Sequence, residues 1–328
     1  MGGSLGAVVT SDAPEQCVIL VGGLGARLGA LTGGLPKPLT AVAGKPFLSY
    51  LIWHVRRMGF SRLLLLAGHR AEHVVEYRDE LNLQDALKVE VAIEPQPLGT
   101  GGALRFASDR LSPSFLLLNG DSLFDFNWLD LVTARGPQVD AVMAVRHAPD
   151  ASRFGVVELD GEQVTRFRER GDASGGLING GVYMLTQALA LACPVKGSLE
   201  QDVLPELAAA GRVRAREQTG FFLDIGVPDA LATAQVQVPA SLPRSATVFS
   251  LADLTGPLSG SPLLPTIRGI AAVKAVNDSG RLALLRVEHQ GALTAYAPLQ
   301  AELRRHGAHL DEIINSAEGL GSTRHDLT

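Results

Sequence analysis

The sequence predicts an α/β protein built on a Rossmann-like, mixed but mostly parallel sheet that is flanked by helices. Short, continuous apolar runs are separated by amphipathic stretches, which is typical of strands buried on both faces of a parallel sheet. The 36 glycines, 18 prolines and few aromatic residues suit a chain with many tight turns. At 328 residues, the chain is long enough for more than one domain.

Strands and helices are expected to alternate along the first half of the chain. The expected strands, each a short apolar run, are 17–20, 62–68, 88–93, 114–121 and 139–145. The expected helices, each an amphipathic stretch between two of these runs, are 46–58, 71–81, 100–108 and 127–134. This alternation is typical of βαβ units.

The pattern changes after about residue 153. Asp160-Gly161 joins two β-like runs and predicts a hairpin. A strand at "LINGGVYML", a helix at 199–210 and a strand at "GFFLDIG" are expected to follow. The predicted division of the chain is a loose leader at 1–16, a main domain at 17–237, a linker at 238–246 and a small α/β segment at 247–328. That last segment is expected to have a βαβα-like order, with a helix-like stretch at 265–280.

Composition and charge exclude several classes of protein. The net charge of −5 gives no basic footprint for nucleic acid, and no apolar run approaches the roughly 20 residues of a membrane span. The N-terminus lacks the order of a signal peptide, and Cys17 and Cys193 provide no disulfide framework. We expect a cytoplasmic protein without a nucleic-acid or membrane partner, and a homo-oligomer is possible.

The glycine-rich segment 18–39 is the first part of the chain whose residues indicate a binding function. Glycines after a strand let backbone N–H groups approach a phosphate closely. The dinucleotide-binding fingerprint fails because Leu28 stands where its third glycine is needed, and the P-loop pattern fits no register. The pattern G-G-x-G-x-R-L followed by P-K-P fits in full, with Arg27 and Lys37 as its cations.

This segment resembles the signature of the sugar-1-phosphate nucleotidyltransferases. "EPQPLGTGGAL" is similar to the family's base-recognition loop, "LLNGDSLF" to its first metal site, and "FFLDIGVPDAL" to the segment with its second metal aspartate. "RFGVVE", "FRER" and "INGGVY" resemble its sugar pocket. The resemblance covers roughly residues 17–235. It implies a glycosyltransferase-A-like fold and attack of a sugar 1-phosphate on the α-phosphorus of a nucleoside triphosphate, with release of pyrophosphate.

The resemblance implies a role for each matching residue. Arg27 would grip the β- and γ-phosphates and Lys37 would touch the phosphate of the reacting centre. Asp121 and Asp224, each expected at the end of a strand, would hold Mg²⁺ through hard oxygen ligands. The nucleotide-binding residues would be Leu20, Gly22, Gly23, Gly25, Glu94, Gly99 and Thr100. The sugar-phosphate site would contain Gly155, Glu169, Arg170, Asn179 and Gly181, with Arg170 where the family usually has lysine.

Glu94 stands where thymidylyl- and uridylyltransferases of the family have glutamine. A carboxylate accepts two hydrogen bonds and donates none, which matches the adjacent N1–H and N2–H₂ groups of guanine. The expected substrates are therefore GTP and a sugar 1-phosphate. The motifs resemble most those of heptose-1-phosphate guanylyltransferases, with mannose-1-phosphate guanylyltransferases and enzymes using another base as alternatives. A catalytically inactive regulatory homologue and a dinucleotide-binding oxidoreductase are more remote alternatives.

Residues 247–328 resemble the opening of a haloacid-dehalogenase-type phosphatase of the heptose-bisphosphate kind. Asp253 matches the second aspartate of such enzymes, but Leu251 occupies the nucleophile's place. Glu288 stands where serine or threonine is expected, and its charge would repel phosphate. We therefore expect this segment to be non-catalytic.

Overall fold

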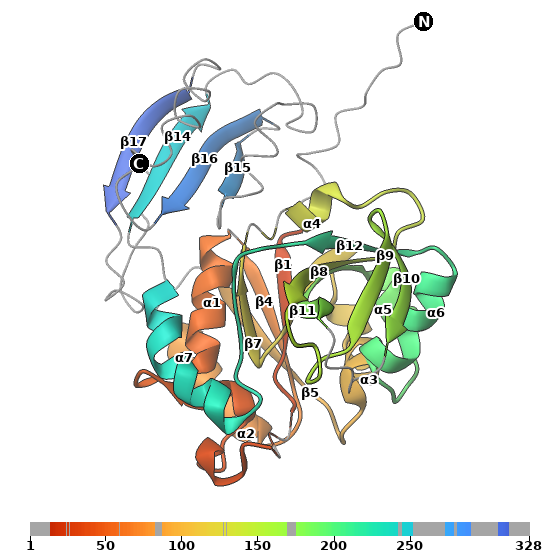
Figure 1. The fold of residues 1–328 in the computed structure, drawn as a ribbon. Helices are drawn as coiled ribbons and strands as arrows, with labels where there is room; N and C mark the ends of the chain where they lie inside the picture. The colour runs from red at the N-terminus through yellow and green to blue at the C-terminus, as the bar shows by residue number, and fades with distance from the viewer. Residues whose placement is uncertain are drawn as a thin grey trace, which may run out of the picture.

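A mixed nine-stranded sheet forms the centre of the main domain (Figure 1). The computed structural model describes residues 14–23, 25, 27–58, 60–82, 87–126, 128, 130–168, 175–241, 245–251, 273–278, 281–289 and 308–314. In order across the sheet, the strands are β5 (Lys88–Ile93), β4 (Arg62–Ala67), β1 (Gln16–Leu20), β6 (Ser114–Asn119), β11 (Gly176–Thr186), β8 (Ala141–Ala148), β12 (Val213–Glu217), β10 (Gln163–Arg168) and β9 (Val156–Asp160).

Parallel pairing joins β5, β4, β1 and β6, and also β8 and β12. The long strand β11 runs antiparallel to both of its neighbours, β6 and β8, and β9 and β10 form the predicted hairpin. The prediction of a mixed α/β fold is confirmed. Gln16 already belongs to β1, so the predicted leader is one residue too long.

Helices cover both faces of the sheet. Along β1, Ile19 belongs to the apolar cluster on one face and Val18 to the cluster on the other, so the strand is buried from both sides. The first cluster includes residues of α1 (Phe47–Arg57), α2 (Ala71–Asn82), α4 (Asp130–Thr133) and α7 (Pro228–Ser241). The second includes residues of α3 (Gly99–Phe106), α5 (Gln187–Ala192) and α6 (Leu204–Ala209). In the described part of the chain, no helix is long and apolar enough to cross a membrane.

Two predicted boundaries in the main domain are wrong. Helix α7 continues to Ser241, so the first four residues of the predicted linker 238–246 are helical. Val238 is fully buried in the first apolar cluster, and this packing holds the last turn in place although Pro239 lies within it. The helix expected at 127–134 is shorter, because α4 covers only Asp130–Thr133.

The described residues beyond 244 form a second, four-stranded sheet in the order β15 (Val273–Asp278), β16 (Arg281–His289), β14 (Ser245–Leu251) and β17 (Ala308–Ile314). All of its pairings are antiparallel. The expected helix at 265–280 is therefore wrong for 273–278. These residues pair antiparallel with β16, and cross-strand pairing overrides local helix propensity. Asp253 lies outside the described residues, and the phosphatase resemblance stays a prediction.

Gly120 fixes the turn that leads from the central sheet to the candidate site. Its N–H donates to the carbonyl of Leu20 at 3.1 Å, at the end of β1. An added Cβ at Gly120 would lie 2.2 Å from that carbonyl oxygen and 3.0 Å from Cγ of Pro38. The turn therefore tolerates no side chain without movement of the backbone.

We expect Gly120→Ala to lower the free energy of unfolding by about 1–3 kcal/mol, as overpacking of a tight site does. Urea unfolding followed by circular dichroism measures this change. Gly136→Ala is the matched control, because its added Cβ would meet nothing closer than 3.4 Å, at the Arg214 side chain. Equal stability of the two variants would show that the turn at Gly120 has room to relax.

Candidate active site

The glycine-rich loop starts where β1 ends, beside the ends of β4 and β6. Val21 N–H donates to the carbonyl of Leu66 at 2.8 Å, which ties the start of the loop to the end of β4. Gly25 has a left-handed backbone with a φ of 61°. The predicted nucleotide-binding residues Leu20, Gly22, Gly23 and Gly25 thus lie at the carboxyl ends of parallel strands, where α/β folds bind ligands.

A short two-stranded sheet brings the two predicted metal ligands together. It pairs β7 (Ser122–Asp125) with β13 (Phe221–Asp224), and neither strand belongs to the central sheet. Asp224 pairs with Ser122, and Ile225 N–H donates to the carbonyl of Asp121 at 2.9 Å. Asp121 was expected at the end of a strand, but β6 ends at Asn119 and Asp121 lies in the turn before β7. The predicted proximity is correct, and its cause is this extra strand pair.

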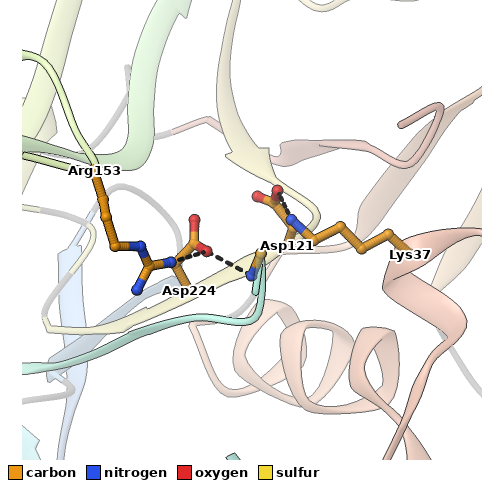
Figure 2. A network of polar contacts seen from close by, with 5 residues as sticks. Lys37, Asp121, Arg153 and Asp224 are labelled. Atoms are coloured by element: carbon orange, nitrogen blue, oxygen red, sulfur yellow. Dashed lines mark hydrogen bonds and ion pairs between the residues drawn. The ribbon is translucent and has the colours of Figure 1, made fainter. Parts of the chain in front are cut away.

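Cations surround the two carboxylates (Figure 2). Lys37 is only 6% exposed, and its Nζ lies 2.5 Å from Oδ2 of Asp121. Arg153 Nη2 lies 3.5 Å from Oδ1 of Asp224, and that oxygen also accepts the Gly226 N–H at 2.6 Å. Burial, and then the neighbouring charge of Asp121, raise the pKa of Asp224 against the opposing effects of Lys37, Gly226 and Arg153. The two carboxylates are therefore close enough to repel each other.

Arg27 belongs to the same cluster. A Cβ added at Gly226 would lie 2.5 Å from Oδ1 of Asp224, 3.1 Å from Nζ of Lys37 and 3.4 Å from Nη2 of Arg27. The predicted catalytic cations and a predicted metal ligand thus meet around one glycine. Only a residue without a side chain leaves room for them.

The residues present fit a divalent cation that is shared with a substrate. Within the described residues there is no group of three or more His, Cys, Asp or Glu side chains that could hold a metal by itself. Two adjacent carboxylates supply hard oxygen ligands, and Mg²⁺ characteristically takes its remaining ligands from water and substrate phosphates. A cation placed between Asp121 and Asp224 would also relieve their repulsion.

Glu94 lies over the start of the glycine-rich loop. Its Oε1 is 3.1 Å from the position of an added Cβ at Gly22 and 2.2 Å from one at Gly68. Its Oε2 accepts the N–H of Leu98 at 3.1 Å. Burial raises the pKa of Glu94, with the Leu98 hydrogen bond opposing it. The predicted base-recognition residue Glu94 therefore lies directly beside the first glycine of the glycine-rich loop.

The other predicted nucleotide-binding residues lie where α3 begins. An added Cβ at Gly99, which has a φ of 78°, would lie 2.5 Å from the carbonyl oxygen of Gly197. The Thr100 hydroxyl donates to the carboxylate of Glu200 at 2.8 Å. Thr100 is thus already engaged within the protein.

The predicted sugar-site residues lie in separate elements. The pairing of β11 with β8 is irregular between Asn179 and Tyr183, and Gly181 lies within this stretch. An added Cβ at Gly181 would lie 2.6 Å from Oγ of Ser122, the residue after Asp121. Gly155 precedes β9 and approaches the carbonyl of Arg168. Glu169 and Arg170 lie outside the described residues, so their roles stay predictions.

Arg153 is a site residue that the sequence analysis missed. It is an exposed residue whose guanidinium lies 5.4 Å from the centre of the Phe154 ring and reaches Asp224. It directly precedes the Phe154-Gly155 pair of the "RFGVVE" motif, which is the one signal that could have identified it.

The sequence profile of a family described as nucleotidyl transferase matches residues 16–241. The chain belongs to the nucleotidyl transferase family. The predicted family and enzyme class are therefore confirmed, and the matched region ends before the four-stranded C-terminal sheet.

Two curated relatives are D-glycero-alpha-D-manno-heptose 1-phosphate guanylyltransferases. The protein of Aneurinibacillus thermoaerophilus is 32% identical over 227 residues, which are 68% of this chain and 98% of the relative. That of Campylobacter jejuni is 34% identical over 218 residues, or 65% and 96% of the two chains.

Among solved structures, HddC from Yersinia pseudotuberculosis complexed with GMP-PN aligns with a TM-score of 0.61 and 31% identity. The alignment covers 68% of this chain and 98% of HddC. An inositol-1-phosphate CTP transferase from T. maritima aligns with a TM-score of 0.59 at 18% identity, which shows the fold alone.

Proposed function

We propose that this chain transfers GMP from GTP to D-glycero-α-D-manno-heptose 1-phosphate, giving GDP-heptose and pyrophosphate with the help of Mg²⁺. The main support is its similarity to guanylyltransferases of that name over nearly their whole length. The grouping of Arg27, Lys37 and Asp224 around Gly226 supports phosphate chemistry at this site. The two free, buried cysteines support a cytoplasmic location.

The proposed reaction needs no protein nucleophile. An oxygen of the sugar phosphate, already anionic at neutral pH, forms a bond to the α-phosphorus of GTP, and the bond from that phosphorus to the departing pyrophosphate breaks. Lys37 would hold the phosphate at the reacting centre, and Arg27 would neutralise the charge that grows on the leaving group. Asp121 and Asp224 would hold Mg²⁺, which supplies further charge neutralisation at the α-phosphate. Rate acceleration then comes from alignment and charge neutralisation.

Glu94 would read the base as a double acceptor from N1–H and N2–H₂ of guanine. We expect Glu94→Gln to weaken GTP use by roughly 1–3 kcal/mol in kcat/KM, because one correctly paired contact is lost. Use of UTP or dTTP should rise, because glutamine can donate to a pyrimidine carbonyl. Steady-state pyrophosphate release with each triphosphate measures both effects. An unchanged nucleotide profile would place base recognition elsewhere.

A matrix of substrates tests the proposed function. GTP, ATP, UTP and dTTP are each combined with the 1-phosphates of D-glycero-α-D-manno-heptose, mannose and glucose, and pyrophosphate release is followed. The proposal expects the fastest release from GTP with the heptose. Other relatives, 29–30% identical, are named as probable mannose-1-phosphate guanylyltransferases. Fastest release with mannose 1-phosphate would show that this chain uses mannose 1-phosphate as its acceptor instead of the heptose. No release from any pair would contradict the proposed activity.

A further inference from the structure

Three hydroxyl groups from separate parts of the chain converge on the carboxylate of Glu200. The Thr100 hydroxyl donates to Oε2 at 2.8 Å, and the Ser198 hydroxyl donates to the same oxygen at 3.1 Å. The Tyr183 hydroxyl donates to Oε1 at 3.3 Å. An ionised carboxylate accepts all three without conflict, because it has acceptor sites only.

Two of these hydroxyl groups make further hydrogen bonds. The Thr100 oxygen accepts the N–H of Leu199, the residue before Glu200, at 2.7 Å, so Thr100 is held to the π-helical turn by two hydrogen bonds. Within β11, the Tyr183 oxygen accepts a hydrogen bond from Nδ2 of Asn179 at 2.5 Å. The side-chain Oδ1 of Asn179 then accepts the N–H of Gly181 at 2.9 Å. The donors from Thr100 on one side, and from Asn179 and Tyr183 on the other, therefore all point toward the Glu200 carboxylate.

The protonation state of Tyr183 keeps that direction fixed. Its side chain is fully buried, and burial together with the Glu200 carboxylate raises its pKa well above the usual value. The hydroxyl therefore remains a donor to Glu200 at every physiological pH.

An unusual backbone brings Glu200 to this place. Residues Leu199–Val203 form a π-helical turn just before α6, and the Ser198 oxygen caps it by accepting the Gln201 N–H at 3.1 Å. Single π-helical turns occur frequently at functional sites.

We propose that Glu200 is a positioning residue that links Thr100, at the start of α3, to Tyr183 and Asn179 on β11, and so keeps the two substrates aligned with each other. This inference rests on the proposed function and on the sequence-based expectation that Thr100 belongs to the nucleotide site and Asn179 to the sugar-phosphate site. Glu200 itself touches neither substrate in this account, because its hydroxyl donors already occupy it. Its effect is on the alignment of the attacking oxygen with the α-phosphorus.

The first test compares Glu200→Gln with wild type, using GTP and the heptose 1-phosphate. Glutamine keeps the shape but turns one acceptor atom into a donor. We expect kcat to fall about tenfold, with both KM values changed less than about threefold, because misalignment affects the transition state more than binding. Thermal unfolding is measured in parallel. Unchanged kcat, or a loss confined to KM, would overturn the proposal. Glu206→Gln, an exposed carboxylate on α6, is the matched control.

The second test uses Tyr183→Phe, which removes a single hydroxyl that donates to Glu200 and carries the test if Glu200→Gln fails to fold. We expect the same fall in kcat from this variant alone. In the double variant, Tyr183→Phe should add no further loss to that of Glu200→Gln, because both break one connection. Losses that multiply would show that the two residues act independently and would overturn the proposal. An inactive wild type would instead contradict the proposed function, and this outcome is distinct from a failure of the Glu200 proposal, in which the wild type is active.

Discussion

Asp224→Asn and Asp121→Asn are each expected to lower kcat by about a thousandfold or more, because each removes one of two carboxylates that would hold Mg²⁺ against the reacting phosphate. The two side chains are held beside each other by the pairing of β7 with β13 and by the hydrogen bond from Ile225 to Asp121. Pyrophosphate release at saturating GTP and sugar 1-phosphate measures the loss. A rate close to that of wild type in either variant would contradict the metal assignment.

Stability provides the control for Asp224→Asn. Burial and Asp121 raise the pKa of Asp224, so the folded protein holds the ionised carboxylate less favourably than the unfolded chain does. At neutral pH the ionised group therefore costs stability, and this cost disappears as the pH falls below the pKa of the unfolded chain. Asparagine carries no charge, so in EDTA at neutral pH the variant should melt no lower than wild type. Added Mg²⁺ and GTP should raise the melting temperature of wild type but not of the variant.

Lys37→Met is expected to lower kcat by about 10²–10³-fold, the effect of removing one preorganised charge from a phosphate-transfer site. Methionine retains the buried stem of the side chain and removes the ammonium group 2.5 Å from Asp121. Because that group competes with a metal for the carboxylate, Mn²⁺ should bind the nucleotide-free variant more tightly than wild type. Rapid kinetics and Mn²⁺ titration followed by electron paramagnetic resonance measure the two effects.

Lys45→Met is the control, because it makes the same substitution at a lysine outside the cluster around Gly226. Lys45 is half-buried and lies on the short strand β3 (Lys45–Pro46). A normal kcat for Lys37→Met would show that the Lys37 ammonium acts only as a structural partner of Asp121.

Local sequence patterns predicted the strands of the central sheet except β12. The apolar run at 62–68 became β4 almost residue for residue, because a continuous apolar segment is buried well in a sheet covered on both faces. The run at 88–93 matches β5, which lies at the edge of the sheet and is only partly buried. The glycine-rich loop could be predicted equally well, since the spacing of its residues is a local property of the chain. The gathering of Arg27, Lys37 and the two aspartates followed from the family motifs.

Strand pairing between segments far apart in the sequence could not be predicted in this way. The strand pair β7–β13 joins segments about a hundred residues apart, and no local pattern shows that it sets the distance between Asp121 and Asp224. The contacts of Glu200 could not be predicted for the same reason, because its partners Thr100 and Tyr183 lie on other elements. At 273–278, a helix-like composition was overridden by hairpin pairing with β16.

Phosphorus NMR of a single reaction mixture tests the central claim most directly. Wild-type protein is incubated with Mg²⁺, GTP and D-glycero-α-D-manno-heptose 1-phosphate, and the phosphorus signals are followed to completion. The proposed function predicts that the heptose 1-phosphate signal is replaced by the two coupled signals of a GDP-sugar, with one pyrophosphate formed for each. Release of inorganic phosphate without a GDP-sugar, or persistence of both substrates, would contradict it.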